Sequence, residues 1–523
     1  MRLGIDFGTT RTVVAAVDRG NYPVISFQTE AGDMQAWYPS LIGVRGGQTV
    51  FGLEAQAHQG EPGWCFLRSL KRSLIELSPD ATVTLGGRPT AIFDLLVQYL
   101  ARLRRDLYEC SNLEVKSKEP LEAQIAIPAN ANSNQRFLTL EGFRRAGFRV
   151  LGMINEPSAA GIEYAHSHIK NEWTARKEYL VVYDLGGGTF DASVIGLANH
   201  YHEVVTDEGI ACLGGDDVDV LLLDLALSRA SCRQELSETA RYYLLEECRR
   251  QKEGLHPNTR KIAIDLARAI EGSGTVIVTT EELYARCAPL VEQTITAMEA
   301  AMGRARQRSG VAWGGVETIY LVGGSSDLPI VGRMLRERYG RRVRRSPYPY
   351  SATAIGLAIA ADAEAGHQLK ERFTRHFGVW REAESGRRVV FDPIFPKDTP
   401  LPERSKPSLA HTRIYHPAHN VAHFRYLECS RLTEDGQPAG DITPWDEIVF
   451  PVDPALRAAS KPDSVEVRRA DEFASQLIEE RYLCNPHGII EVTITDQTTF
   501  YQQKYRLRQP TVMKQQKSVA KKR

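Results

Sequence analysis

Two short glycine-rich stretches carry residue types that can bind phosphate. Residues 5–10 are IDFGTT and residues 183–189 are YDLGGGT, so each passes from apolar residues through an aspartate and a glycine turn to threonine. Glycine costs a strand or a helix about 0.5–1 kcal/mol relative to alanine, so three in a row need a reason. Backbone N–H groups at such turns form anion-binding nests, and threonine hydroxyls add hydrogen bonds.

The aspartates of these stretches indicate a metal ion. Asp6 and Asp184 are suited to a hydrated Mg²⁺, because this hard cation keeps several waters and takes few carboxylates. One glycine turn after a strand is often only a turn. Two with the same residue order, about 178 residues apart, predict a duplicated fold that clamps one polyphosphate between its halves.

The elements that would position these loops predict an α/β domain over residues 1–366. Short apolar strands alternate with longer amphipathic helices, which favours a largely parallel central sheet. In such sheets ligands bind beyond the carboxyl ends of the strands. The clearest expected strands lie at 122–128, 178–184 and 317–324, and the clearest expected helices at 92–109, 133–146, 217–228 and 281–308.

The second part of the chain has a different residue pattern. Segments 423–432 and 488–507 show the period-2 alternation and β-branched content of extended strands, so we expect an all-β domain over 367–508. Residues 509–523 contain no acidic residue and no apolar periodicity, which predicts a disordered basic tail.

Composition limits the compartment and the partners. The 65 basic and 65 acidic residues balance, so no global field favours nucleic acid or membrane as a partner. The eight cysteines are scattered and contain no CxxC, which favours reduced thiols in a reducing compartment. The opening residues MRLGIDFGTT lack the apolar core of a signal peptide. We expect a cytoplasmic protein.

Seven blocks of the sequence carry a family resemblance. Their order and approximate spacing over 1–366 resemble the nucleotide-binding domain of the seventy-kilodalton heat-shock chaperone (DnaK) family, within the actin and sugar-kinase superfamily. The resemblance implies a duplicated actin-like (ribonuclease H-like) domain followed by a smaller all-β, sandwich-like domain. INEPSAA with DLGGGTFD about 30 residues later favours the chaperone branch over sugar kinases and actin. The blocks are GIDFGTT (4–10), SLKRSL (69–74), IAIPANANSNQR (125–136), INEPSAAGIEY (154–164), YDLGGGTFD (183–191), CLGGDDVD (212–219) and YLVGGSSDLP (320–329).

The resemblance implies the chemistry of a slow ATP hydrolase. Lys71 would position the attacking water and offset the γ-phosphate charge, and Asp184 and Thr189 would orient that water. Glu156 would bind the water shell of Mg²⁺, and Asp191 would complete the carboxylate cluster around Mg²⁺ and any accompanying K⁺. The implied catalytic residues are Lys71, Glu156, Asp184 and Thr189, and the implied metal-site residues are Asp6, Glu156, Asp184 and Asp191.

The same resemblance implies the residues that contact ATP. Thr9 and Thr10 would contact the β- and γ-phosphates, and Pro128 and Arg136 match positions that relay nucleotide state toward the substrate domain. The full implied set is Gly8, Thr9, Thr10, Gly186, Gly187, Gly188, Thr189, Gly214, Gly215, Lys252, Gly323, Gly324 and Ser325.

The adenosine side departs from the family pattern. Asp327 and Tyr350 replace the arginine and aspartate that usually line the purine pocket, and Arg249 and Glu253 flank the retained Lys252. Losing the stacking partner of the base costs about 1–2 kcal/mol, roughly tenfold in affinity. We therefore expect the phosphates to supply most of the binding free energy and ATP to be preferred over GTP by less than about tenfold.

The β part resembles the family's peptide-binding sandwich through turn residues and strand order. The acidic, leucine-rich linker of the family is replaced by residues 363–380, and the helical lid that normally follows is expected to be absent. Slow release of a bound client would then be lost.

Three functions share the two glycine-rich loops. The leading hypothesis is a chaperone-like ATPase whose nucleotide state controls client binding by the β domain, with a co-chaperone or exchange factor as a further partner. The alternative is a weakly hydrolysing, nucleotide-dependent binding module for one dedicated protein partner. A sugar or metabolite kinase would need a general-base aspartate near a polar cleft, and no motif for one is present.

Overall fold

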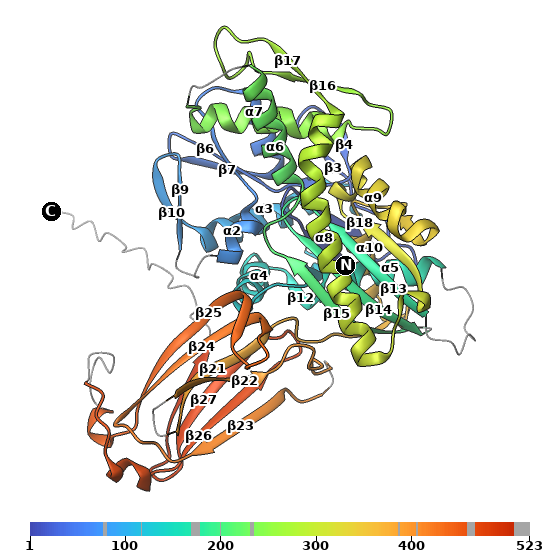
Figure 1. Cartoon of the computed structure of the whole chain (residues 1–523). Helices are drawn as coiled ribbons and strands as arrows, with labels where there is room; N and C mark the ends of the chain where they lie inside the picture. The colour runs from blue at the N-terminus through green and yellow to red at the C-terminus, as the bar shows by residue number, and fades with distance from the viewer. Residues whose placement is uncertain are drawn as a thin grey trace, which may run out of the picture.

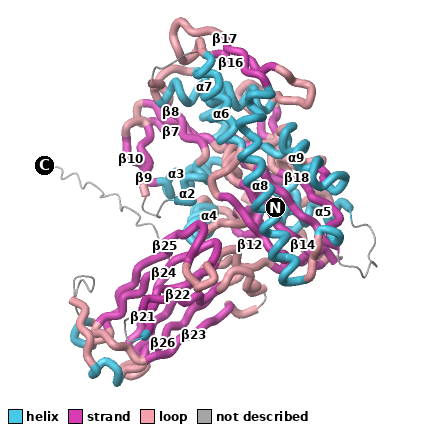
Figure 2. Tube along the Cα trace, viewed as in Figure 1, coloured by secondary structure: helices cyan, strands magenta, loops and turns pink. Residues whose placement is uncertain are grey.

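The chain has two parts, an α/β part and a strand-rich part that lies beneath it in Figure 1. Figure 2 shows that the helices are concentrated in the first part and that strands dominate the second. The expected basic tail at 509–523 lies outside the described residues. The computed structural model describes residues 1–76, 81–116, 118–168, 178–198, 200–230, 235–384, 388–403, 406–457 and 466–506.

Two sheets with the same strand order form the core of the α/β part. The first has the order β12-β11-β1-β2-β5 and the second β19-β18-β13-β14-β15, with β20 added at its edge. In both, the central strand is parallel to one neighbour and antiparallel to the other. This matching topology confirms the predicted duplication. The strands are β1 Arg2–Phe7, β2 Arg11–Ala16, β5 Tyr38–Pro39, β11 Glu122–Ile127, β12 Arg149–Asn155, β13 Glu178–Leu185, β14 Phe190–Ala198, β15 Tyr201–Ile210, β18 Val316–Val322, β19 Val343–Arg345 and β20 Gln368–Lys370.

The central hairpin of each sheet carries one of the glycine-rich stretches. The turn between β1 and β2 is closed by Gly8, whose N–H donates to the Arg11 carbonyl at 3.1 Å. The turn between β13 and β14 is closed by Gly186, whose N–H donates to the Thr189 carbonyl at 3.0 Å. The duplication therefore puts the two loops at equivalent positions, each at the turn of the central hairpin of its sheet.

Helices cover the sheets at the expected positions. The predicted helix 92–109 is Ile92–Glu109, and the other three agree within two residues at each end. The helices are α1 Gly52–Ala57, α2 Leu70–Glu76, α3 Ile92–Glu109, α4 Ser133–Arg145, α5 Glu156–His168, α6 Gly215–Arg229, α7 Glu238–Glu253, α8 Thr280–Ser309, α9 Pro329–Tyr339 and α10 Ala352–Ala361. Smaller sheets add β3 Phe27–Gln28, β4 Met34–Gln35, β6 Leu41–Arg45, β7 Gln48–Phe51, β8 Cys65–Arg68, β9 Thr82–Leu85, β10 Arg88–Ala91, β16 Lys261–Asp265 and β17 Thr275–Thr279.

Helix α10 packs unusually close to α5. A Cβ at Gly356 would lie 1.8 Å from the carbonyl oxygen of Ala159, so only glycine lets the two backbones meet there. Because α5 begins with Glu156, this contact fixes the place of that carboxylate relative to the first sheet.

The C-terminal part consists of two four-stranded antiparallel sheets, as predicted for an all-β domain. Their orders are β22-β21-β24-β25 and β23-β26-β27-β28. Within the predicted segment 488–507, residues 490–506 form a hairpin, because Asp496 accepts the backbone N–H of Thr498 at 2.9 Å and turns the chain. The strands are β21 His376–Ala383, β22 Arg388–Phe395, β23 Leu409–Tyr415, β24 Val421–Leu432, β25 Pro438–Pro451, β26 Ile478–Cys484, β27 Ile490–Asp496 and β28 Tyr501–Arg506.

The segment between the two parts belongs partly to the α/β sheet. Strand β20 pairs in parallel with β15, and the Gln368 N–H donates to the His200 carbonyl at 2.7 Å. The second sheet thus extends a few residues beyond the predicted limit of 366.

The β part docks on helix α4. Glu428 of β24 accepts hydrogen bonds from the backbone N–H of Ser133, at 2.9 Å, and from its hydroxyl. Ser133 is the first residue of α4, where free N–H groups and the helix dipole favour a carboxylate. Figure 1 shows the ends of β24 and β25 against α4.

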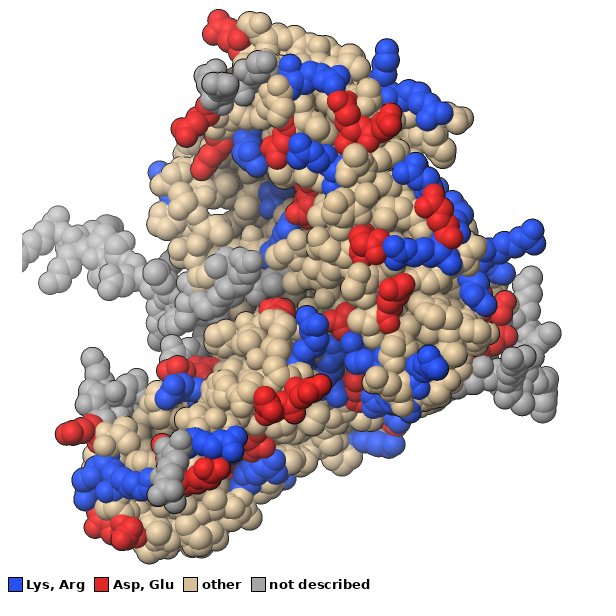
Figure 3. All heavy atoms as spheres, in the orientation of Figure 1, with Lys and Arg blue, Asp and Glu red and all other residues tan. Residues whose placement is uncertain are grey.

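Charge is mixed over the visible surface. Figure 3 shows basic and acidic side chains interspersed on both parts, in keeping with the balanced totals of 65 and 65. Among the described residues, no helix is both long and apolar enough to cross a membrane.

Candidate functional site

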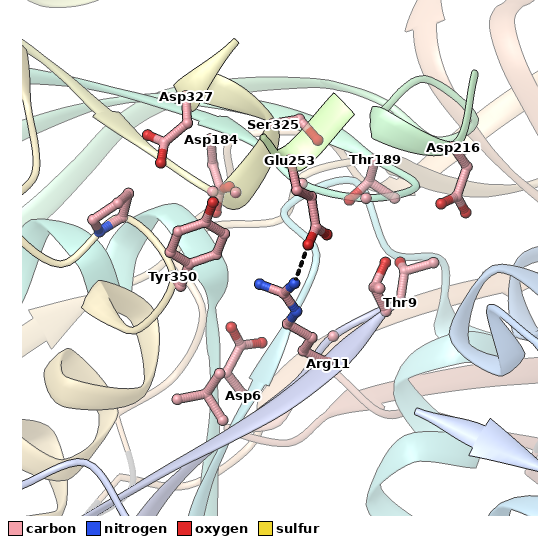
Figure 4. A pocket seen from close by; sticks show the side chains of 18 of the residues that line it. Asp6, Thr9, Arg11, Asp184, Thr189, Asp216, Glu253, Ser325, Asp327 and Tyr350 are labelled. Atoms are coloured by element: carbon pink, nitrogen blue, oxygen red, sulfur yellow. Dashed lines mark hydrogen bonds and ion pairs between the residues drawn. The ribbon is translucent and has the colours of Figure 1, made fainter. Parts of the chain in front are cut away.

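A cleft with a cavity volume of about 140 Å³ lies between the two halves of the α/β part and is open to solvent. Both glycine-rich loops line it, together with α2, α5, α7 and the segments before α9 and α10 (Figure 4). The sequence-predicted residues that it gathers are Asp6, Gly8, Thr9, Thr10, Lys71, Glu156, Asp184, Gly186, Gly187, Thr189, Lys252, Gly323, Gly324 and Ser325.

The two glycine-rich loops touch each other. A Cβ at Gly187 would lie 2.4 Å from the Thr10 hydroxyl oxygen, and one at Gly188 would lie 2.9 Å from a Thr9 methyl. Thr9 and Thr189 are both buried. Gly187 and Gly188 are therefore required by the approach of the opposite loop, whereas a Cβ at Gly186 would make only ordinary contacts, at 3.6 Å or more.

Lys71 and Glu156 form a buried ion pair at the floor of the cleft. Lys71 lies near the start of α2 and Glu156 begins α5, and the Lys71 Nζ contacts Glu156 Oε1. Burial opposes the charge of Lys71, but the carboxylates of Glu156, Asp6 and Asp191 outweigh it and raise the pKa of this lysine. Lys71 thus remains a fixed positive charge.

The carboxylates around this pair carry more negative charge than one lysine can balance. Burial and the Glu156 charge raise the pKa of Asp6 to about 7, and the same two causes raise the pKa of Asp191 to about 8. Burial, followed by the Glu156, Asp191 and Asp6 charges, raises the pKa of Asp184 well above its ordinary value. A cation would relieve this repulsion.

The donor arrangement favours a hydrated cation over a bare one. Among the described residues, no group of three or more His, Cys, Asp or Glu side chains is placed to bind a metal ion directly. Carboxylates that face a common space without converging on one point suit Mg²⁺, which keeps several of its waters. Of the four predicted metal-site residues, Asp6, Glu156 and Asp184 line the cleft and fit Mg²⁺ held through water, whereas Asp191 lies outside the lining.

Comparison with known proteins identifies the family. The family profile described as "Hsp70 protein" matches residues 98–374, more than half of the chain. The chain belongs to the Hsp70 family. This confirms the family resemblance and the nucleotide-binding-domain fold. The first glycine-rich loop and Lys71 lie ahead of the matched range.

Chaperones described as HscA homologs are similar over most of this Hsp70-family chain. The protein of Bordetella petrii is 31% identical over 387 residues, which cover 71% of this chain and 59% of the relative. That of Acidithiobacillus ferrooxidans is 28% identical over 425 residues, covering 77% and 64%. The chain thus matches less than two thirds of the length of these relatives.

Two of the predicted residues, Gly214 and Gly215, support the second loop from outside the cleft lining. A Cβ at Gly214 would lie 2.5 Å from the Gly187 carbonyl oxygen, and the Gly215 N–H donates to the Gly186 carbonyl at 3.0 Å. Gly188 and Asp191 also lie outside the lining. Lys252 does line the cleft, but its Nζ donates to the Gly215 carbonyl at 2.7 Å and so braces this loop.

On the adenosine side of this Hsp70-family cleft, the unusual residues bind one another. Asp327 contacts the Arg345 guanidinium and forms a hydrogen bond with Tyr350. Arg249 donates to Asp216 at 2.9 Å and to Asp219 at 3.3 Å. The Asp327 side chain keeps one oxygen, Oδ1, without a hydrogen-bond partner.

Sequence reasoning missed Arg11. It lines the cleft, and its Nη2 lies 2.6 Å from Glu253 Oε2 (Figure 4). The available signal was its place directly after Thr10 in the first glycine-rich loop. Its partner lies 242 residues away, so no local pattern pairs them.

Substitution of Asp184 by asparagine should separate stability from nucleotide binding. Because the folded-state pKa of Asp184 lies above its ordinary 3.8, its charge costs stability at pH values above the folded-state value, and this cost disappears as the pH falls. Without nucleotide, Asp184→Asn should therefore raise the melting temperature by at least about 2 °C at pH 8 and by much less near pH 4. The measurement is thermal unfolding of both proteins at the two pH values.

The same variant, and Asp6→Asn, should weaken Mg-dependent nucleotide binding, because each removes a carboxylate that faces the hydrated ion. Calorimetric titration of both variants with and without Mg²⁺ checks this. Unchanged affinity in both variants would contradict the paired-loop site.

Nucleotide selection is expected to be weak. At the predicted adenosine side, Asp327 and Tyr350 replace the family's usual residues and bind each other and Arg345, so the described residues leave no arginine there to stack on a purine. Competition calorimetry should show less than about tenfold preference for ATP over GTP. A preference of a hundredfold or more would show that other residues rebuild an adenine pocket.

Proposed function

We propose that this chain is a slow, Hsp70-type ATPase that binds Mg·ATP in the cleft and couples nucleotide state to protein binding by its β part. One observation carries the proposal. Two glycine-rich loops from equivalent hairpins line one cleft together with the buried Lys71–Glu156 pair, which supports a phosphate site beside a fixed cation. A purely structural role would not require buried charge at that point, since burying an ion pair seldom adds stability.

The chain's own residues would act by position and charge. The N–H groups and hydroxyls of Thr9 and Thr10 hold the phosphates, and Lys71 balances the charge that develops on the transferred group. Asp184 and Thr189 orient the attacking water. Bound Mg²⁺ supplies further charge neutralisation. Hydrolysis of this kind depends mainly on positioning and preorganised electrostatics.

A chain of hydrogen bonds supports coupling to the β part. The Asn130 N–H donates to Asp191 Oδ1 at 3.3 Å, and the Asn130 side-chain oxygen accepts from Arg375 Nη1 at 3.3 Å. Arg375 also binds Asp441, at 2.6 Å, in the β part. Arg136, predicted as a relay, is buried beside this junction and donates to Asn155 at 2.9 Å.

The partners follow from this assignment. The β part would bind an unfolded or a dedicated protein client, and a co-chaperone or exchange factor would act on the α/β part. We place the protein in the cytoplasm. The seven described cysteines are all unpaired, which suits a reducing compartment.

A second candidate is a nucleotide-dependent binding module with little turnover, acting on one dedicated partner. The Arg11–Glu253 pair across the cleft and the Asp327–Arg345 pair on the predicted adenosine side favour it, because a nucleotide must accommodate or displace both. Single-turnover hydrolysis of radiolabelled ATP, with and without an unfolded protein, distinguishes the two. We expect hydrolysis that the unfolded protein accelerates. Binding of ATP with no measurable turnover in either case would favour the module.

A further inference from the structure

An ion pair crosses the middle of the cleft. Arg11 begins β2 of the first half, and Glu253 ends α7, which packs on the second half. Their side chains meet at 2.6 Å, and Figure 4 shows the pair between Tyr350 on one side and Thr9 on the other. The bond therefore joins the two halves through the space that a nucleotide would occupy.

Two aromatic rings hold the Arg11 guanidinium in place. Its central carbon lies 4.7 Å from the centre of the Trp37 ring and 5.2 Å from that of Tyr350. Such cation–π contacts orient the planar group and leave its charge available. The donor fork of a guanidinium suits the paired oxygens of a phosphate.

The neighbours of Arg11 identify the competing ligand. Arg11 directly follows Thr9 and Thr10 of the first glycine-rich loop, so phosphate oxygens bound on that loop would lie beside its guanidinium. A bound polyphosphate thus competes with Glu253 for the Arg11 guanidinium.

We propose that Arg11 is a cross-cleft switch that exchanges its Glu253 carboxylate for the phosphates of a bound nucleotide. This inference rests on the proposed function and adds a phosphate-binding residue that the family motifs do not contain. Glu253 acts as the competitor that weakens nucleotide binding, and the exchange releases the bond between the two halves.

Calorimetric titrations with Mg·ADP and with adenosine test the exchange. Arg11→Met should weaken Mg·ADP binding about tenfold or more and leave adenosine binding unchanged, because only the first ligand offers phosphates. Glu253→Gln should strengthen Mg·ADP binding about threefold or more. In Arg11→Met protein, the Glu253→Gln substitution should lose its effect.

A second pair that joins the halves provides the control. Arg68 contacts Glu246 but neither residue lines the cleft, so Arg68→Met and Glu246→Gln should not change Mg·ADP affinity selectively. Equal weakening by Arg11→Met and Glu253→Gln, or equal effects on ADP and adenosine, would overturn the exchange. If the wild-type protein fails to bind Mg·ADP, the proposed function falls together with this inference. If it binds Mg·ADP and Arg11→Met changes nothing, only this inference falls.

Discussion

Substitution of Lys71 by alanine is expected to reduce ATP hydrolysis by about 10²-fold or more, the effect of removing one preorganised charge from a reaction centre. Lys71 is buried against Glu156, and the surrounding carboxylates keep it protonated. Nucleotide binding should change much less, because the loops and Mg²⁺ still hold the phosphates. Single-turnover hydrolysis and calorimetric binding of Mg·ATP measure the two effects separately.

A matched control is available in Lys406, an exposed lysine paired with Glu403 at 2.8 Å in the C-terminal part. Lys406→Ala should hydrolyse ATP at the wild-type rate. Lys71→Met, which keeps the length of the side chain, separates loss of charge from loss of packing. Wild-type hydrolysis by both Lys71 variants would remove this residue from the reaction.

Substitution of Arg375 by methionine is expected to destabilise the protein by about 1–3 kcal/mol, the cost of leaving buried hydrogen-bond acceptors without their donor. Arg375 is only 4% exposed. It donates to Asp441 at 2.6 Å and to Thr443 at 3.0 Å, and it reaches Asn130 across the junction of the two parts. Urea unfolding, followed by fluorescence, measures the change in unfolding free energy.

The exposed pair Arg388–Glu384, at 3.2 Å, is the control for this experiment. Arg388→Met should change stability by less than about 1 kcal/mol, as expected for a surface ion pair. If the β part separates from α4 in Arg375→Met, limited proteolysis should cut near 372–376 faster than in the control. Equal stability of the two variants would show that Arg375 does not hold the junction.

Much of the fold follows from short stretches of sequence. The glycine-rich loops, the strand at 178–185 and the helix at 133–145 depend on residues close along the chain. Asn132, for example, caps that helix by accepting the Gln135 N–H at 2.8 Å. Two loops with one residue order also predicted the duplication, because equivalent hairpins need equivalent turns. The family and the two-part architecture were predictable because short sequence blocks and the period-2 strand pattern are also local features.

The family resemblance alone did not reveal which predicted residues face the cleft. Gly214 and Gly215 stand in the expected motif, yet they brace the second loop from behind. Arg136 matched a relay position, and the packing of the β part buries it. An alignment gives the residue type at a position, whereas the direction of a side chain depends on what packs against it.

The sequence by itself determined the two glycine-rich loops and the order of the two parts, because these depend on local patterns, and the family resemblance indicated the acidic residues around Lys71. Only the tertiary structure decided that Arg11 meets Glu253, that Arg345 meets Asp327, and that the Asp6 and Asp191 carboxylates are buried enough to raise their pKa values. Partners far apart in the chain are set by how the two halves close. The pKa of a carboxyl group depends on how much water the folded chain removes from around it, and residue spacing in the sequence does not show this.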